Sequence, residues 1–318
     1  MSLQKTVCEP SKFRSSIPPE IMDNEELNKM IKVLPANYNF EIHKCIWQIQ
    51  KNNYQKVALQ FPEGLLMYSC FISDILEMFT ASKVLIMGDV TYGACCVDDF
   101  TAKALGCDFL IHYGHSCLIP VNETLIKAMY VFVDISFDLS HLTQVVRANF
   151  DKNKKFAILG TIQFASSIPA IREALCDYDI FVPQAKPLSP GEVLGCTAPK
   201  LPSDINFFIY LGDGRFHLEA IMIANSSIPA YRYDPYSKVM SLEYYDIEQM
   251  HSLRKSSIET ARKSKKIGLI LGTLGRQGSP KILESLKSKL IAKNIDFCVF
   301  LISEITPAKL SLFTDIDA

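Results

Sequence analysis

The sequence has no excess of charge of either sign and no long apolar segment. Its 33 Lys and Arg residues balance 34 Asp and Glu residues, which leaves a net charge of −1. Nucleic acid or an anionic membrane is therefore not expected as a partner, because both attract strongly basic proteins. No apolar run approaches the span of a bilayer, and the N-terminal stretch MSLQKTVCEPSKFRSSIPPE lacks the apolar centre of a signal peptide. We expect a soluble cytoplasmic protein.

The ten cysteines include no CxxC pair. Structural disulfides are rare in a reducing compartment, so each cysteine is expected to be a buried small side chain, a metal ligand or a nucleophile. Cys70 and Cys176 fall in apolar helical patterns, and Cys298 falls in an apolar strand pattern. We predict that these three pack in the core.

The composition that remains is that of a globular protein. Hydrophobic residues make up 48% of the chain and charged residues 21%. These values exclude a disordered chain, a collagen-like fibre and a charge-rich coiled coil. Short apolar runs, among them 56–61 and 155–160, alternate with helical patterns. Such runs are typical of strands buried on both faces of a parallel sheet, and they predict an α/β fold.

A similar pattern starts three times, at Lys56, Lys155 and Lys266: a basic residue, an apolar strand, a glycine-containing loop and a helix. The repeat predicts three Rossmann-like α/β modules with short parallel sheets. We expect an extended N-terminal arm at 1–44, a first domain at 45–152, a second domain at 153–262 and a third at 263–318. A long charged helix at about 242–265 should bridge the second and third domains. The third is too short for four strands, so we expect it to be incomplete.

Ligands of open parallel sheets bind beyond the carboxyl ends of the strands. The first small and polar cluster in such a position is GDVTYGACCVDD at 88–99. Side chains of adjacent residues point apart, so Cys95 and Cys96 are not expected to bind the same metal. One of them is predicted to be a ligand and the other to be buried; two packed cysteines in a loop are the alternative.

The second cluster places His112, His115 and Cys117 within six residues. This spacing suggests zinc, but a structural zinc site normally closes with a fourth ligand of recognisable spacing, and no second half is visible. A polar loop that shapes a pocket is the favoured interpretation. In a further loop, LGDGRFHLEA at 211–220, His217 is either a base or, more in keeping with its apolar helix, a packing histidine.

The third cluster, LSPGEVLGCTAP at 188–199, holds Cys196 between Gly195 and Thr197. Backbone N–H groups of such a loop can stabilise a thiolate, so Cys196 and Cys95 are the cysteines most suited to chemistry. The fourth cluster is GTLGRQGSP at 272–280, where Pro280 suits the first position of a helix. That helix N-terminus favours an anion, which Arg276 or Gln277 can hydrogen-bond; a plain turn is equally compatible with the loop.

Taken together, these blocks closely resemble the diphthamide biosynthesis protein 1 family. The resemblance runs from about Ile17 to the last residue. It is carried by the blocks ALQFPEGLL, GDVTYGACCVDD, YGHSCLIP, KPLSPGEVLGCTAP, YLGDGRFHLE, YRYDPYSK and LGTLGRQGSPKILE.

The resemblance implies one subunit of 2-(3-amino-3-carboxypropyl)histidine synthase, a non-standard radical S-adenosylmethionine enzyme. Three homologous domains of the family each give one cysteine to a 4Fe-4S cluster, which is reduced and splits the sulfonium. The 3-amino-3-carboxypropyl group is then transferred to a histidine of elongation factor 2. The partners implied are a homologous second subunit, elongation factor 2 and an electron-donor protein.

Carried over by residue, the family's first two cluster ligands are Cys95 and Cys196. The GRQG loop resembles the family's pocket for the methionine carboxylate, with Gln277 and Arg276 as the binding residues. The remaining pocket neighbours implied are Tyr92, His115 and Asp213.

The third family ligand lies in a Cys-Pro-Arg-Leu block that follows the LSLF block, and this chain ends at Ala318 before it. We therefore expect a weakened or absent cluster. Two alternatives stay open: a truncated, non-catalytic subunit that binds its partner, and a nucleotide-dependent oxidoreductase on a Rossmann-type sheet. The missing GxGxxG after the first strand counts against the second alternative.

Overall fold

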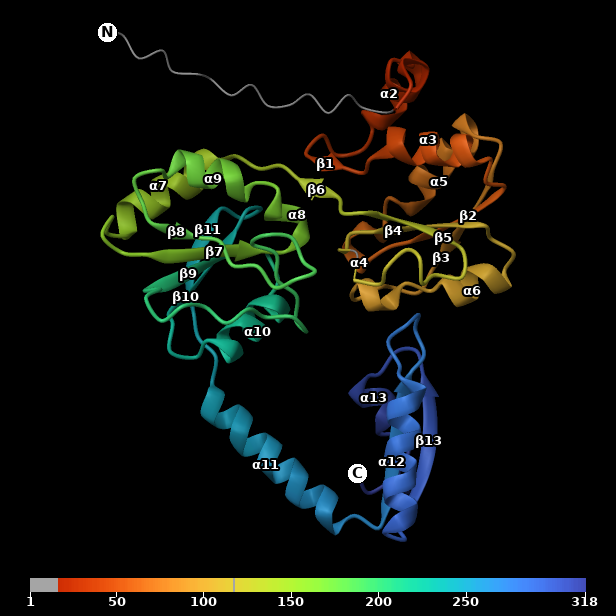
Figure 1. The fold of residues 1–318 in the computed structure, drawn as a ribbon, viewed down its shortest axis with the longest axis vertical. Helices are drawn as coiled ribbons and strands as arrows, with labels where there is room; N and C mark the ends of the chain where they lie inside the picture. The colour runs from red at the N-terminus through yellow and green to blue at the C-terminus, as the bar shows by residue number, and fades with distance from the viewer. Residues whose placement is uncertain (1–16, 117) are drawn as a thin grey trace.

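The computed structural model describes residues 17–116 and 118–318. Two α/β lobes lie side by side, and a smaller unit that contains the C-terminus is attached through the long helix α11 (Figure 1). The described residues form a four-stranded, a five-stranded and two two-stranded sheets. An α/β fold with parallel sheets, as the apolar runs predicted, is confirmed.

The first lobe is built on a parallel sheet in the order β3-β2-β4-β5. Its strands are β2 (Lys56–Gln60), β3 (Lys83–Met87), β4 (Phe109–Tyr113) and β5 (Lys127–Val131). Its helices are α3 (Ile42–Asn52), α4 (Glu63–Leu66), α5 (Ser69–Phe79) and α6 (Asp99–Ala104). β4 is buried along its whole length, as expected of a central parallel strand.

The segment before α3 is not the extended arm that we expected. Its described part forms α1 (Pro19–Met22), α2 (Glu25–Ile31) and β1 (Tyr38–Asn39). Leu27, Leu34 and Phe40 are buried in the core of the first lobe. Asn24 caps α2, because its side chain accepts a hydrogen bond from the Leu27 N–H at 2.9 Å. The apolar residues are too widely spaced for the pattern to stand out, but they suffice to dock the segment.

The second lobe contains a sheet in the order β11-β10-β9-β7-β8, in which only the β10–β11 pair is antiparallel. Its strands are β7 (Phe156–Gly160), β8 (Ile180–Phe181), β9 (Phe207–Leu211), β10 (Ala230–Asp234) and β11 (Val239–Glu243). Its helices are α7 (Leu139–Asn149), α8 (Ile162–Ala165), α9 (Ile168–Ala174) and α10 (Phe216–Ala224).

The second lobe begins earlier than the predicted boundary at residue 153. Leu142 and Val146 of α7 are buried in its core, and Figure 1 shows α7 beside α9. β6 (Asp134–Ile135) precedes α7 and pairs with β1, so the N-terminal segment also contacts the crossing between the lobes. A sequence pattern shows where α7 lies along the chain but not which sheet it covers.

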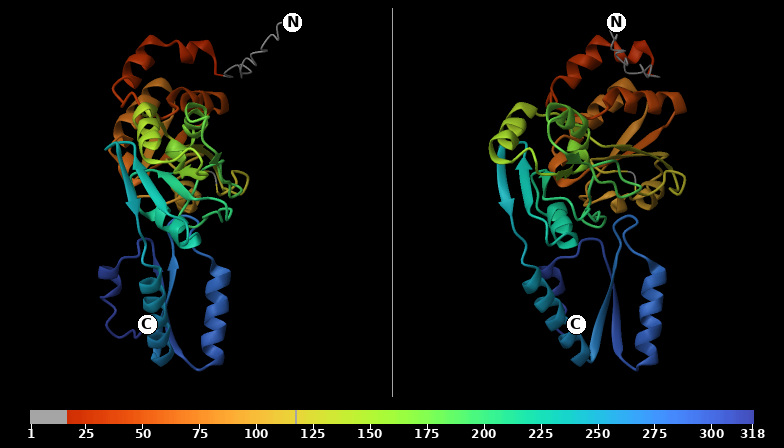
Figure 2. Two further views of the ribbon diagram at one scale, coloured as in Figure 1. Left: turned by 90° about the vertical axis from the view of Figure 1, so that its left-hand side faces the viewer. Right: turned by 60° about the vertical axis from the view of Figure 1, so that its left-hand side comes forward.

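The third unit is a parallel pair of strands with one long helix along its side (Figure 2). Its elements are β12 (Lys266–Gly272), α12 (Pro280–Ala292), β13 (Asp296–Ile302) and α13 (Pro307–Leu310). α11 (Ile247–Lys263) leads into it and has no buried residue within the described chain. The linker helix is thus shorter than predicted, because residues 242 and 243 belong to β11.

Two of the three cysteines assigned to packing are placed differently. Cys70 and Cys176 are exposed, whereas Cys298 is partly buried in β13. Cys70 lies on the solvent-facing side of α5, where single apolar residues are common, and Cys176 lies in the turn that follows α9. Within the described chain, no helix has the length and apolar character needed to cross a membrane.

Candidate functional site

The loop after β3 holds Cys95 and Cys96 in a short 3-10 turn, Ala94–Cys96. Cys96 is buried and its Sγ accepts hydrogen bonds from the Tyr92 N–H at 3.4 Å and the Gln277 Nε2 at 3.0 Å. Cys95 is only partly buried. The hydrogen bond from Cys95, followed by these donors, lowers the pKa of the Cys96 thiol to about 6 although burial opposes this. The same bond raises the pKa of Cys95. The two sulfurs therefore lie within hydrogen-bonding reach of each other, contrary to the expectation that adjacent side chains point apart, with Cys96 buried and Cys95 partly accessible.

The second predicted cysteine comes from the other lobe. Cys196 is exposed, and its Sγ lies 3.6 Å from the Thr197 Oγ1. Its neighbour Gly195 packs against a ring: a Cβ there would lie 2.3 Å from the Phe216 Cε1. A charge on Cys196 raises the pKa of Cys95, so the two thiols are within electrostatic reach of each other. Two loops about a hundred residues apart in sequence thus come within electrostatic range of each other.

The GRQG loop of the third unit docks directly on the Cys95–Cys96 turn. Gly275 has a φ of +58°, and a Cβ there would lie 2.5 Å from the carbonyl oxygens of Cys96 and Val97. Its successor Arg276 donates its backbone N–H to the Cys95 carbonyl at 2.9 Å. Glycine is required at 275 both for this left-handed backbone and for the close approach.

Arg276 is placed differently from what the resemblance implied. Its Nε and Nη2 each lie 2.8 Å from the Asp99 carboxylate, which is fully buried, and its Nη2 also reaches the Glu123 carbonyl at 2.9 Å. The guanidinium carbon lies 4.8 Å from the centre of the Phe100 ring. Burial raises the pKa of Asp99, but the hydrogen bonds from Arg276 and the Leu125 N–H outweigh this and hold it below its usual value. Arg276 is thus engaged by the first lobe and anchors the loop.

Gln277 is exposed, and its amide is directed at the Cys96 sulfur. The helix α12 begins at Pro280, as the sequence predicted. Ser279 occupies the N-cap position, although its side chain makes no capping bond with any described residue. Gln277 therefore stands between a cysteine turn and a helix N-terminus, which is a suitable setting for an anion.

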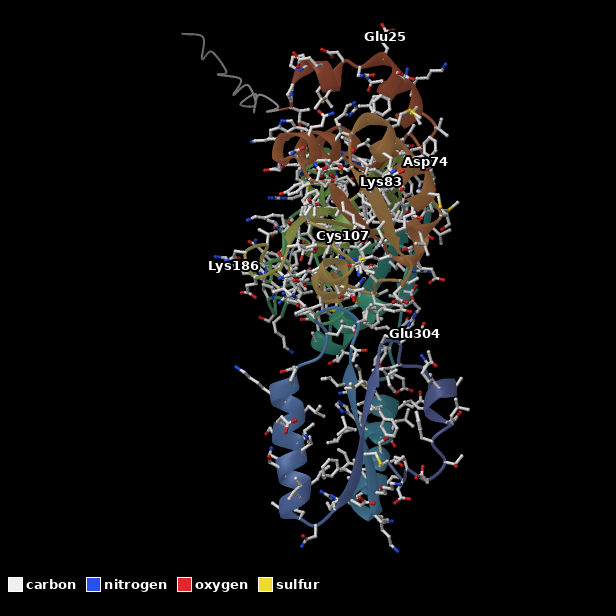
Figure 3. The ribbon with its side chains drawn as sticks, turned by 90° about the vertical axis from the view of Figure 1, so that its right-hand side faces the viewer. Glu25, Asp74, Lys83, Cys107, Lys186 and Glu304 are labelled. Carbon is white, nitrogen blue, oxygen red and sulfur yellow. The ribbon has the colours of Figure 1, made fainter. Side chains whose placement is uncertain are left out.

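Tyr92 is 56% exposed, and its hydroxyl donates to the Glu304 carboxylate at 3.1 Å. Glu304 lies where the third unit meets the two lobes (Figure 3). The two residues border a cleft of about 190 Å³, which is also lined by Gly88, Asp89, Val90, Leu274 and Ser303. Tyr92 therefore links the loop after β3 to the third unit at this cleft.

The histidines of β4 and its loop lie side by side. His112 is fully buried, and its two ring nitrogens lie 2.9 Å from the Gln60 Oε1 and 3.1 Å from the His115 Nδ1. Burial, with a contribution from a charge on His217, lowers the pKa of His115 to about 4. Cys117 lies outside the described residues. Within the described chain, no group of three or more His, Cys, Asp or Glu residues is arranged to hold a metal ion.

Asp213 is exposed in the loop after β9, and its backbone carbonyl accepts a hydrogen bond from the Arg232 Nη1 at 2.5 Å. The charge of Asp213 affects the pKa of two neighbouring side chains. Burial raises the pKa of Tyr210 and Asp213 adds to this, whereas burial lowers the pKa of His217 and Asp213 opposes it. Tyr210 was not singled out by the sequence pattern, whereas His217 was considered there as a base or a packing histidine, and its buried Nδ1 has no partner in the described chain.

Five buried polar atoms have no hydrogen-bond partner in the described chain, and they belong to loops, to β9 and to the first turn of α10. They are the Thr91 Oγ1, Ser116 Oγ, Glu192 Oε1, Tyr210 hydroxyl and His217 Nδ1. Unpaired buried polar groups are rare in folded proteins and indicate water or a bound molecule. With two thiols in reach of each other, this donor set fits a thiolate-bound metal group with a polar molecule beside it.

The comparisons with known proteins agree on one family. The family described as "Putative diphthamide synthesis protein" matches residues 61–318. A relative from Dictyostelium discoideum is 56% identical over 312 residues, which are 95% of this chain and 66% of that protein. A human relative is 58% identical over 306 residues, which are 95% of this chain and 70% of that protein. Both are named 2-(3-amino-3-carboxypropyl)histidine synthase subunit 1. This chain spans about two thirds of the length of the Dictyostelium protein.

One solved structure supports the fold. Dph2 from Pyrococcus horikoshii with a 4Fe-4S cluster superposes with a TM-score of 0.73 and 23% identity, over 86% of this chain and 81% of that chain. At this identity the similarity establishes the α/β fold with parallel sheets and nothing finer.

Proposed function

This chain belongs to the diphthamide synthesis family, and from that premise we propose that it is subunit 1 of 2-(3-amino-3-carboxypropyl)histidine synthase. The reaction proposed is the first step of diphthamide synthesis: transfer of a 3-amino-3-carboxypropyl group from S-adenosylmethionine to a histidine of elongation factor 2. The observation that carries the proposal is the meeting of Cys95, Cys196 and the GRQG loop, which come from three separate parts of the chain. Family membership leaves the oxidoreductase alternative without support.

The proposed cofactor is a 4Fe-4S cluster with Cys95 and Cys196 as two of its ligands. Such a cluster supplies the electron that splits a carbon–sulfur bond of a sulfonium. The chain's own contribution is position: the turn buries Cys96 and leaves Cys95 partly accessible, and the loop at Gly195 leaves Cys196 exposed within electrostatic range of Cys95. The three sheet units are proposed to be homologous Rossmann-like modules whose loops converge there.

The remaining residues divide into binding and positioning residues. Gln277, beside the N-terminus of α12, is proposed to bind the methionine carboxylate, since both offer N–H donors to an anion. Tyr92, His115 and Asp213 are proposed to line the pocket. Arg276, neutralised by Asp99, is proposed as a positioning residue that holds Gln277 in place. The five unpaired polar atoms offer partners to the bound molecule.

The proposed partners are a homologous second subunit, elongation factor 2 and an electron-donor protein, in the cytoplasm. The names of the relatives, which contain the word "subunit", support a partner chain. The alternative of a subunit that binds its partner without taking part in the chemistry makes a different prediction. It predicts that restoring this chain to cells that lack the native subunit does not restore the histidine modification.

Cysteine substitution tests the proposal directly. The chain, with its partner subunit, is reconstituted anaerobically with iron and sulfide, and its iron content and EPR signal after reduction are measured. Cys95→Ala and Cys196→Ala should each lose the iron and the signal attributable to this chain. Cys176→Ala is the matched control, because Cys176 is exposed on the second lobe. A Cys95→Ala variant with undiminished iron and signal would contradict the proposed site.

A further inference from the structure

A buried chain of polar side chains begins beneath the Cys95–Cys96 turn. Gln60, at the end of β2, is fully buried and donates its Nε2 to the Cys96 carbonyl at 2.8 Å. Its Oε1 accepts the Asp98 backbone N–H at 3.3 Å. A backbone N–H only donates and a carbonyl only accepts, so these two bonds determine which end of the amide is oxygen.

That orientation determines the tautomers of two histidines. The Gln60 Oε1 also lies 2.9 Å from the His112 Nδ1, which must therefore carry the proton and donate. His112 is fully buried and burial lowers its pKa well below the usual value, so the ring is neutral and its Nε2 is an acceptor. The His112 Nε2 lies 3.1 Å from the His115 Nδ1, which must in turn carry a proton. The Nε2 of neutral His115 is thus an unprotonated acceptor.

The chain ends close to the second cysteine loop. A charge on His217 reaches His115, and the His217 Nδ1 is buried with no partner among the described residues. The preceding residue, Phe216, packs against Gly195, which adjoins Cys196. Hydrogen bonds therefore run from the Cys96 carbonyl to His115, and the charge effect of His217 on His115 places the second cysteine loop within electrostatic range of that end.

We propose that the His115 Nε2 accepts the proton that the substrate imidazole loses, and that Gln60 and His112 are positioning residues that hold it in this tautomer. The inference rests on the proposed function. The product name, a 2-substituted histidine, means that a carbon–carbon bond forms at a ring carbon whose C–H bond breaks. In the net reaction one carbon–sulfur bond of a sulfonium also breaks, a neutral thioether leaves, and the positive charge of the sulfonium departs as that proton.

A weak base suffices for this step. Because the carbon–sulfur bond is split by one electron, the ring that has gained the new bond becomes aromatic again by losing both this proton and one electron. The electron would return to the cofactor that supplied it, and the proton is strongly acidic. An acceptor must be neutral at working pH, and burial keeps His115 neutral. After the transfer, the low affinity of a buried imidazole for a proton favours its release.

The first test uses the protein alone, without cofactor or substrate. Histidine nitrogens labelled with ¹⁵N are observed by NMR between pH 5.5 and 7.5, with signals assigned by the loss of each in His112→Gln and His115→Gln. Both rings should be neutral and protonated on Nδ1, whereas free histidine prefers the proton on Nε2. In Gln60→Leu, His112 should no longer be held in that form. A His115 ring protonated on Nε2, or charged near pH 7, overturns the proposal.

The second test measures coupling in the complete system, with the partner subunit, a reductant and the protein substrate. In His115→Gln the amount of modified histidine per molecule of cleaved S-adenosylmethionine should fall by at least about tenfold. His43→Gln is the control: His43 lies in α3 and bonds to the Asn28 Oδ1 at 2.9 Å, so the ratio should stay at the wild-type value. Unchanged ¹⁵N signals of the other histidines establish that each variant is folded.

The outcomes separate the two hypotheses. If cleavage and modification fall together in His115→Gln, or if the ratio does not change, the proton-acceptor role is wrong. If the wild-type complex cleaves no S-adenosylmethionine, the proposed function fails, while the tautomer experiment still reports on the histidine chain by itself.

Discussion

Replacing Arg276 with leucine should release the third unit from the first lobe. The substitution leaves the Asp99 carboxylate buried, with the Leu125 N–H at 2.6 Å as its remaining partner across the loop. Removing one member of a buried ion pair costs about 3–5 kcal/mol, because an uncompensated charge stays in the interior. Asp99 is fully buried and Arg276 is 20% exposed, so solvent screening reduces this value little.

The effect should appear first as local opening, because few contacts hold the GRQG loop in place. The backbone N–H of residue 276 donates to the Cys95 carbonyl, so its hydrogen exchange reports on this docking. A loss of 3–5 kcal/mol corresponds to exchange that is roughly 10²- to 10⁴-fold faster. Amides in β2 and β4 should exchange at the wild-type rate if the first lobe stays folded.

Two further variants test whether the buried ion pair causes this effect. Asp99→Asn combined with Arg276→Leu should be more stable than the sum of the two single effects predicts, since no buried charge remains. Arg262→Leu removes an exposed pair with Glu259 in α11 and should change stability by less than about 1 kcal/mol. Exchange at residue 276 that is less than tenfold faster in Arg276→Leu would show that Asp99 does not anchor the loop.

Three other predictions follow from single contacts. Gly275→Ala should destabilise the docked form of the same loop by about 1–3 kcal/mol, because the added Cβ would lie 2.5 Å from two carbonyl oxygens and the φ of residue 275 is +58°. Gly88→Ala is the control, because a Cβ at residue 88 would have no atom within 4 Å, and it should leave hydrogen exchange in the loop unchanged. Tyr92→Phe removes a partly exposed bond to Glu304 and should cost no more than about 1 kcal/mol by urea unfolding. The folded-state pKa of His115, about 4, lies below its unfolded value near 6.5, so the unfolded state binds more protons between these pH values. Stability should therefore fall by up to about 3 kcal/mol from pH 6.5 to pH 4, and by less in His115→Gln, as measured by urea unfolding at each pH.

Each of these has a result that would contradict it. Equal hydrogen exchange in Gly275→Ala and Gly88→Ala would show that the loop can move away without loss. A loss of several kcal/mol of unfolding free energy in Tyr92→Phe would mean that this hydrogen bond holds the whole third unit against the first lobe. A pH dependence that is the same in wild type and His115→Gln would place the titration on other groups, of which His112 and His217 lie nearest.

Local sequence patterns were sufficient to predict where the strands begin and which loops follow them. β2, β7 and β12 begin at Lys56, Phe156 and Lys266, at or next to the predicted starts, because a buried parallel strand needs an unbroken apolar run of about five residues. The same patterns misplaced Cys70 and Cys176, since an apolar neighbourhood in sequence does not say which side of a helix faces solvent, as for Cys70, or where a helix ends, as for Cys176.

The residue types of the candidate site were also visible in the sequence, but the partner of each side chain was not. Cys95, Cys196 and Gln277 stood out because they follow strands in loops of small residues. Arg276 stood out for the same reason, yet its partner is Asp99, which lies 177 positions away in the chain. The Asp-Asp pair after Cys96 was the one signal that could have indicated this ion pair, and spacing alone does not connect two such distant positions.

The amino-acid sequence by itself determined the class of fold, the position of most strands and the loops in which chemistry is expected, because these depend on residues that are neighbours along the chain. Only the tertiary structure decided which side chains meet. The pairing of Arg276 with Asp99, the approach of Cys196 to Cys95 and the hydrogen-bond chain from Gln60 to His115 join segments whose separation in sequence carries no information about distance in space.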